Sequence, residues 1–426
     1  MSGDGAAGLQ SVLGAVAADR ALGEDFQALC ASGGRFAGSD SERTALDLLA
    51  ARLAAVPGGA LERLPLEYRG WRRGAGSIER AAGAALPCVA LVRSPATPAG
   101  GLSGDVLDLG RGTPEDFDAR AAQIPGRIVM VRHEYMFASG TIHRRRKYAR
   151  AMELGAAGFL IACPWPGNLP VTGSSGAQPG RGIPAAGISA ETAARLPEGT
   201  RVTLNLEAED VPGARTQTLV LELPGDGPEI VVLSAHVDGH HLGESAMDNA
   251  SGLAAALSVA RALAPLPRRR SLRVCLFSIE EWALEGSRRY VEALAPAARE
   301  SIAVNLNLDS VAGSPHLTAV TSGYPRLAQW VRATSGAAGL PLRTNPALMQ
   351  NSDHYNFAVA GVPALRLVAG FDEPGSDLRY VLTPADTADK VPTLQLKAAA
   401  LASAALAWNA CTVPVLDLRA GAPRTA

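Results

Sequence analysis

The stretch 229–250, EIVVLSAHVDGHHLGESAMDNA, decides the fold. It begins with a continuous apolar run, which is typical of a strand buried on both faces, as in parallel sheets. The run leads into His236 and Asp238, and Asp248 stands just before an alanine-rich segment that predicts a helix over 250–263. Functional groups in such sheets collect beyond the carboxyl ends of the strands. We therefore expect a functional site where this strand ends.

The same alternation continues along the chain on both sides of this stretch. A strand is predicted at 218–224, and buried strands are predicted at 271–279 and 302–308, with a helix over 281–294 between them. Helices and strands of these lengths in alternation indicate parallel βαβ units. The expected fold class is α/β, with a mixed, mostly parallel sheet covered by helices on both faces.

Two further regions complete the expected domain organisation. Leucine and alanine recur at helical spacing over 41–56, with capping residues at 39–41. Short β-rich runs divided by glycine and proline, then a helix and a strand, fill the region 85–210. We expect this region to be an inserted smaller α/β domain, and residues 1–84 and 211–426 to form one domain in two pieces.

Composition and charge exclude several classes of function. The chain has 426 residues with 40 basic and 41 acidic side chains, a net charge of -1, so no global positive field favours nucleic acid or anionic lipid. The five cysteines lie far apart without CxxC spacing, which indicates a reducing compartment. The apolar stretch 396–413 contains Lys397 and predicts a packed helix that is too polar to span a bilayer. We expect a cytoplasmic protein without nucleic acid or membrane partners, and the oligomeric state stays open.

Residue types that bind metals follow three successive predicted strands. The strands lead into His236, into the pair Glu280 and Glu281, and into Asp309. Each has a structural role when taken alone: a hydrogen-bonded histidine, an acidic helix start, and an N-cap in the case of Asp248. Neighbouring strands lie about 5 Å apart, so these side chains would face one cleft. Carboxylates gathered in this way need cations to balance them.

Six motifs then reveal a family resemblance. They are AHVDG (235–239), SAMDNASG (245–252), SIEEWALEGS (278–287), NLDS (307–310), SDHYNF (352–357) and TPADTADKV (383–391). In order and context they resemble the M28 metallopeptidases, the zinc-dependent aminopeptidase family. The resemblance covers 216–410 closely and includes the segment 33–53, and residues 85–210 resemble a protease-associated (PA) domain. It implies a phosphorylase/hydrolase-like fold of the zinc-peptidase type.

The resemblance also implies a set of metal ligands. His236 and Asp309 would bind one ion, Glu281 would bind a second, and Asp248 would bridge the two. Zinc is the expected metal, and a carboxylate-rich set that lacks one imidazole could also accept manganese or cobalt.

The catalytic roles follow from the same resemblance. Glu280 matches the general base, which would take a proton from a metal-activated water and return it to the leaving amine. Asp238 matches the carboxylate that would orient the His236 ring by accepting a hydrogen bond from its far nitrogen. The implied activity is hydrolysis of amide or peptide bonds, by an aminopeptidase or a small-peptide amidohydrolase. The expected substrate is a small peptide or an aminoacyl amide.

One position departs from the family pattern. Two-metal members carry a histidine immediately before the TPxDT segment, and here that position is Leu382, in YVLTPADT. One hypothesis is a one-metal hydrolase that holds zinc through His236, Asp248 and Asp309 and leaves a position open for water. One tight ion would then be found, with a second weak or absent.

A replacement for the missing histidine could also come from elsewhere in the chain. His240 or His241, on the loop after the 229–235 strand, or His354 in SDHYNF, could supply the ligand, with His354 alternatively placed on the substrate side. The remaining alternative is loss of catalysis, which would leave an inactive or repurposed binding protein on the M28 fold. The presence of Glu280 favours an enzyme.

Overall fold

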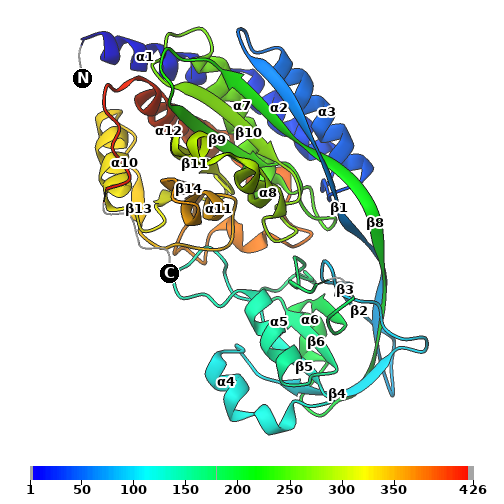
Figure 1. Cartoon of the computed structure of the whole chain (residues 1–426). Helices are drawn as coiled ribbons and strands as arrows, with labels where there is room; N and C mark the ends of the chain where they lie inside the picture. The colour runs from blue at the N-terminus through cyan, green and yellow to red at the C-terminus, as the bar shows by residue number, and fades with distance from the viewer. Residues whose placement is uncertain (1–2, 179, 421–426) are drawn as a thin grey trace. The chain divides into compact units, whose positions relative to one another are not determined.

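The computed structural model describes residues 3–178 and 180–420, which form two compact units (Figure 1). The larger unit contains the described residues of Met1–Leu66, Thr216–Val381 and Asp386–Ala426. The smaller unit contains the described residues of Glu67–Arg215, together with Leu382–Ala385.

The larger unit is built on a mixed sheet. Its strand order is β13 (Arg343–Asn345), β12 (Leu317–Val320), β14 (Ala364–Ala369), β11 (Ile302–Leu308), β9 (Ile230–His236), β10 (Ser271–Phe277) and β8 (Arg201–Leu223). Strands β14, β11, β9 and β10 are parallel neighbours, and β12 is parallel to β13. Antiparallel pairs occur at β12 with β14 and at β10 with β8. The long strand β1 (Ala60–Arg80) also pairs with β8. The prediction of a mixed, mostly parallel sheet is confirmed.

Helices cover both faces of this sheet (Figure 1). They are α1 (Gly3–Ala18), α2 (Ala21–Ala31), α3 (Asp40–Ala54), α7 (Ser251–Leu263), α8 (Glu285–Ala293), α9 (Pro296–Glu300), α10 (Pro325–Ala337), α11 (His354–Val359) and α12 (Thr393–Thr412), with short turns η2 (Ala246–Ala250), η3 (Asp377–Tyr380) and η4 (Ala388–Lys390). Helices α7 and α12 contact β9 and are themselves covered by α1, while α2 covers α7. Helix α7 is therefore buried around nearly its whole circumference, which explains its apolar, alanine-rich sequence.

Most predicted elements of this unit are present, and one helix begins later than predicted. The helix predicted over 281–294 is α8, which begins at Glu285. Ile279, Ala283 and Leu284 all have positive φ angles, so the chain forms an irregular turn after β10 before it can enter a helix. The two glutamates Glu280 and Glu281 consequently lie in a loop and not at the start of a helix.

The smaller unit has its own α/β arrangement. Its elements are β2 (Leu86–Pro87), β3 (Val89–Ala90), β4 (Leu102–Asp108), α4 (Pro114–Ala119), η1 (Ala121–Gln123), β5 (Ile128–Arg132), α5 (Arg144–Glu153), β6 (Gly158–Ala162), β7 (Ala185–Ile188) and α6 (Ala190–Ala194). Strands β4, β5, β6 and β7 are parallel, and β3 and β8 are antiparallel edges.

The unit boundaries differ from those expected at 84 and 211. They fall at Glu67 and Arg215 because the long strands β1 and β8 carry the chain from one unit into the other. The short segment Leu382–Ala385 also groups with the smaller unit. Residues 1–2, 179 and 421–426 of the expected domains lie outside the described residues.

The apolar stretch predicted over 396–413 corresponds to α12, which packs against α7 and α1. Among the described residues, no helix has the length and apolar character needed to cross a membrane. The five cysteines are buried and free.

A buried arginine ties the N-terminal segment to the loop after β9. Arg35 is fully buried, and its guanidinium donates hydrogen bonds only to backbone carbonyls. The acceptors are Leu29, Gly33, Val237, Glu244 and Ser245, at distances from 2.7 to 3.2 Å. One side chain therefore fixes two loops that are about two hundred residues apart in the sequence.

Replacing this arginine should destabilise the larger unit. Arg35→Met leaves five carbonyls without their charged donor, three of them in fully buried hydrogen bonds, and we expect a loss of about 3 kcal/mol or more in the free energy of unfolding, measured in urea. Arg43→Met is the matched control, because Arg43 is exposed and its contacts with the Asp40 carboxylate and the Gly38 carbonyl lie at the surface, so its effect should stay within about 0.5 kcal/mol. Equal losses in the two variants would contradict this role.

Candidate metal centre

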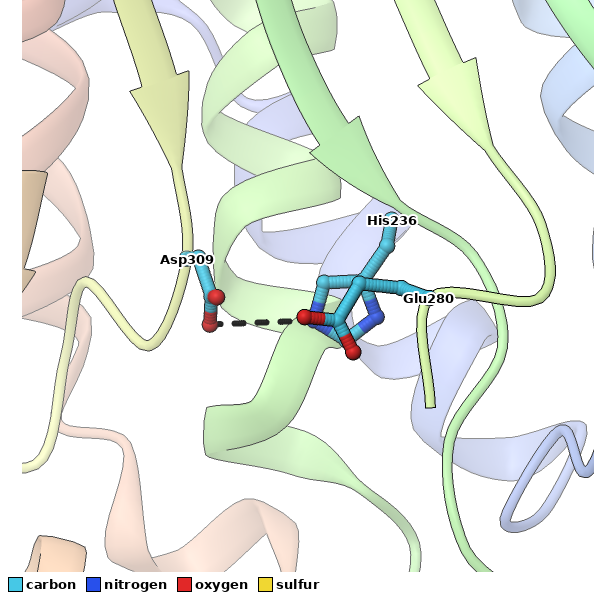
Figure 2. Close-up of side chains that lie close together, drawn as sticks. All are labelled: His236, Glu280 and Asp309. Carbon is cyan, nitrogen blue, oxygen red and sulfur yellow. Dashed lines mark ion pairs between the residues drawn. The ribbon is translucent and has the colours of Figure 1, made fainter. Parts of the chain in front are cut away.

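Three parallel strands of the larger unit end side by side. Strand β9 lies between β10 and β11, and its last residue, His236, is paired in register with Phe277 at the end of β10. Glu280 follows three residues after Phe277, and Asp309 comes directly after β11. Figure 2 shows the side chains of His236, Glu280 and Asp309 gathered at this edge. The strand ends thus bring together the side chains that the sequence analysis expected to meet.

The distances within this group are short. His236 Nε2 lies 3.0 Å from Asp248 Oδ1 and 3.7 Å from Asp309 Oδ1. One ligand atom each from His236, Glu280 and Asp309 lie within 4.8 Å of one another, and all three residues are buried. Asp248 is turned toward the histidine because its backbone is not helical, with φ -116° and ψ 87°. It therefore does not cap α7, and Asn249 instead accepts the Gly252 amide.

The His236 ring is oriented by its far nitrogen. Nδ1 lies 2.9 Å from the backbone carbonyl oxygen of Asp238, which can only accept a hydrogen bond, so Nδ1 carries a proton. Nε2 then faces the carboxylates of Asp248 and Asp309. A neutral ring would present a lone pair to two anions, so this arrangement fits a cation placed between them.

The Asp238 carboxylate makes different contacts from those expected. Its Oδ1 lies 3.9 Å from His236 Nδ1, beyond hydrogen-bond distance. The two carboxylate oxygens instead accept the backbone amides of Glu280 at 2.9 Å and Glu281 at 3.1 Å. Asp238 thus orients the histidine through its carbonyl and the two glutamates through its carboxylate.

Asp309 is held by several donors. Arg366 Nη2 lies 2.9 Å from its Oδ1, Ser310 Oγ donates to the same oxygen at 3.0 Å, and Ser352 Oγ donates to Oδ2. Asn307 in turn donates to Ser352 at 2.7 Å. Burial opposes ionisation of Asp309, but Arg366, His236 and the Ser352 hydrogen bond outweigh burial and hold its pKa below the ordinary value. Asp309 is therefore an anion ready to bind a cation.

Sequence reasoning missed Arg366 and Ser352. The signal for Arg366 was available, since it is the single charged residue in the apolar run ALRLVA of strand β14. A buried charge within a strand requires a partner, and here the partner is Asp309.

The negative charges of Glu280 and Asp248 are not fully neutralised by neighbouring cationic groups. Burial, reinforced by repulsion from Glu281, raises the pKa of Glu280 well above its ordinary value despite the attraction of His236. Burial and then repulsion from Asp309 raise the pKa of Asp248. Burial alone would lower the pKa of His236, but the surrounding carboxylates, Glu280 first, raise it well above the ordinary value. Burial and repulsion thus both favour binding of a cation at this cluster, and the residues present fit a zinc ion.

The three other histidines considered from the sequence lie in different settings. His240 is buried, and its Nε2 lies 2.6 Å from Glu281 Oε1. His241 is exposed, and its ring stacks on Phe36 with the centroids 4.0 Å apart. His354 is fully buried on α11, where burial lowers its pKa to about 3, and it is not among the described donors that converge at the strand ends.

Leu382 supplies no ligand atom. It belongs to the segment that groups with the smaller unit, and its carbonyl accepts a hydrogen bond of 2.9 Å from the Thr172 amide of that unit. At the position where the family pattern has a histidine, this chain therefore has a buried leucine, which is 3% exposed.

Two family assignments agree with this geometry. Residues 218–407 match peptidase family M28, and residues 88–196 match the PA domain. Two parts of the chain thus match known domains, an M28 peptidase domain and a PA domain. The PA domain falls within the smaller unit, and the M28 match contains each strand that ends at the metal centre.

Relatives of this M28 peptidase domain include enzymes from several organisms. Aminopeptidase YwaD of Bacillus subtilis is 28% identical over 309 residues, which are 70% of this chain and 65% of that protein. Leupeptin-inactivating enzyme 1 of Streptomyces exfoliatus is 32% identical over 179 residues, which are 40% of each chain. The chain thus spans less than two thirds of the length of either relative.

Solved structures share the fold of this chain. A zinc aminopeptidase from Bacillus subtilis matches with a TM-score of 0.73 and 23% identity, covering 92% of this chain and 95% of that chain. A peptidase M28 precursor from Shewanella amazonensis matches with a TM-score of 0.80 and 23% identity, covering 96% of each chain.

Zinc should stabilise the folded chain through this cluster. Adding zinc to chelator-treated protein should raise its melting temperature, because an ion at 100 times its Kd adds about 2.7 kcal/mol to the native state. Asp309→Asn should remove most of this zinc-dependent increment, measured by differential scanning calorimetry. Asp47→Asn, at an exposed acid, should keep it. A full zinc response in Asp309→Asn would show that the ion binds elsewhere.

Proposed function

We propose that the chain is a zinc-dependent aminopeptidase that removes the first residue from small peptides or aminoacyl amides. The observation that carries this proposal is the convergence of His236, Asp309 and Glu280 at the ends of three parallel strands of an M28 domain. Relatives named as aminopeptidases support the choice of reaction.

The catalytic ion is assigned to His236, Asp248 and Asp309. One imidazole and two carboxylates make a common zinc environment, and three protein ligands leave a position for the reactants. When bound, zinc supplies Lewis acidity, which polarises a peptide carbonyl and favours loss of a proton from water. The donors around Asp309 keep that carboxylate ionised and correctly turned for this task.

Glu280 is assigned the proton transfer. Its carboxyl is buried, and one of its oxygens lies within 4.8 Å of ligand atoms of His236 and Asp309, where it can accept a proton from water. It then returns this proton to the nitrogen of the leaving amine. The Asp238 carboxylate fixes the loop that carries Glu280 by accepting two successive backbone amides. The base is thereby positioned by the fold before the substrate arrives.

We also infer a cytoplasmic location. The five free and buried cysteines, which fit a reducing compartment, support this assignment.

Glu280→Gln tests the reaction directly. The variant cannot accept the proton, so we expect turnover of aminoacyl p-nitroanilides to fall by about 10²- to 10⁴-fold with the zinc content unchanged. Glu292→Gln is the control, because Glu292 is an exposed acid on α8 that pairs with Arg288. It should keep full activity.

Two outcomes would reject the proposal. Wild-type turnover in Glu280→Gln would remove Glu280 from the mechanism. No turnover by the wild-type protein with zinc, manganese or cobalt, across a panel of aminoacyl substrates, would favour a binding protein on the same fold.

A further inference from the structure

The loop after β9 presents a histidine at a fixed place. His240 follows His236 by four residues, and its amide donates a hydrogen bond of 2.9 Å to Ser245 Oγ. The Gly239 amide donates to the carbonyl of Arg35 at 3.0 Å, and the Arg35 side chain in turn binds the carbonyl of Ser245. The backbone on both sides of His240 is therefore held by neighbouring segments of the larger unit.

Close packing beneath the loop reinforces this restraint. Gly34 lies so near the carbonyl oxygen of His240 that a Cβ atom at position 34 would come within 1.7 Å of it. A side chain at Gly239 would likewise collide with Ser245, at 2.4 Å from its Oγ. The loop can adopt this path only because both positions are glycine.

The His240 ring is buried against a carboxylate without the geometry of a hydrogen bond. The residue is 4% exposed, and Nε2 lies 2.6 Å from Glu281 Oε1. Nevertheless, neither ring nitrogen has a hydrogen-bond partner of acceptable geometry. Burying both ring nitrogens without hydrogen bonds costs free energy, so such an arrangement calls for another interaction that compensates the loss. A cation bound by both groups provides one, because the histidine and the carboxylate would then be joint ligands.

A shared acid links this pair to the first ion. Asp248, whose Oδ1 lies 3.0 Å from His236 Nε2, is buried in the same cluster as Glu281, and the two carboxylates repel each other. A second cation between Asp248 and Glu281 would relieve this repulsion.

We propose that His240, Glu281 and Asp248 form a second divalent cation site, in which His240 replaces the histidine that is missing at Leu382. Each site would then have one imidazole and two carboxylates, with Asp248 common to both. Such a set suits zinc and also accepts manganese or cobalt. The proposal rests on the proposed function, since Asp248 would be shared with the catalytic ion.

Metal stoichiometry tests the second site. Wild-type protein stripped with a chelator should bind two equivalents of zinc in calorimetric titrations, with metal content checked by elemental analysis after dialysis. His240→Ala should keep one equivalent at wild-type affinity and bind the second about 100-fold more weakly or worse, because loss of even an indirect partner costs 10- to 100-fold. If His240→Ala does not fold, His240→Gln can replace it, because glutamine is a polar side chain of similar size. The same weakening of the second equivalent is expected for this variant.

The neighbouring histidine provides the matched control. His241→Ala changes the adjacent residue, whose exposed ring stacks on Phe36, and should retain both equivalents. Visible absorption of the cobalt-substituted protein gives a second readout, since the bands from the second equivalent should disappear in the His240 variants alone.

The outcomes separate this proposal from the proposed function. One equivalent in the wild type, or two in the His240 variants, would overturn the second site even if the protein hydrolyses peptides. Two equivalents in the wild type and one in the His240 variants would uphold it even if no peptide substrate is turned over.

Discussion

Parallel pairing of β9 with β10 and β11 is the constraint on which the site depends. In a parallel arrangement, successive strands finish at the same edge, so residues that lie about forty or seventy positions apart in the sequence become neighbours. His236, Glu280 and Asp309 meet for this reason. The register of the strands places the three side chains next to one another, and the helices on both faces bury the sheet that carries them.

Such a concentration of buried charge has to be balanced, and the chain supplies only part of the balance itself. Arg366 neutralises Asp309 from the neighbouring strand β14, and two backbone amides stabilise Asp238. Burial and mutual repulsion still favour protonation of Glu280 and Asp248. The strand ends therefore carry uncompensated negative charge that divalent cations can neutralise. In this way the arrangement of the sheet favours binding of the metal that hydrolysis requires.

The positions of the core strands and the residues at their ends could be predicted from the sequence, because apolar runs and the acids after them report directly on burial. The start of α8 could not, since the positive φ angles after β10 depend on how the turn packs. The contact of His240 with Glu281 also escaped a firm prediction, because the path of the loop that carries His240 depends on Gly34 and Arg35, far away in the sequence. Periodicity does not report on such contacts.

Leu382 groups with the smaller unit, whereas the other positions of the metal centre belong to the larger unit. A histidine at this position would make cation binding depend on a segment that groups with the smaller unit. With His240 in that role, every assigned ligand comes from the larger unit, and four of them lie between the end of β9 and the turn before α8. All the ligands in this proposal therefore belong to one compact unit, so substitutions in the smaller unit would leave every ligand in place.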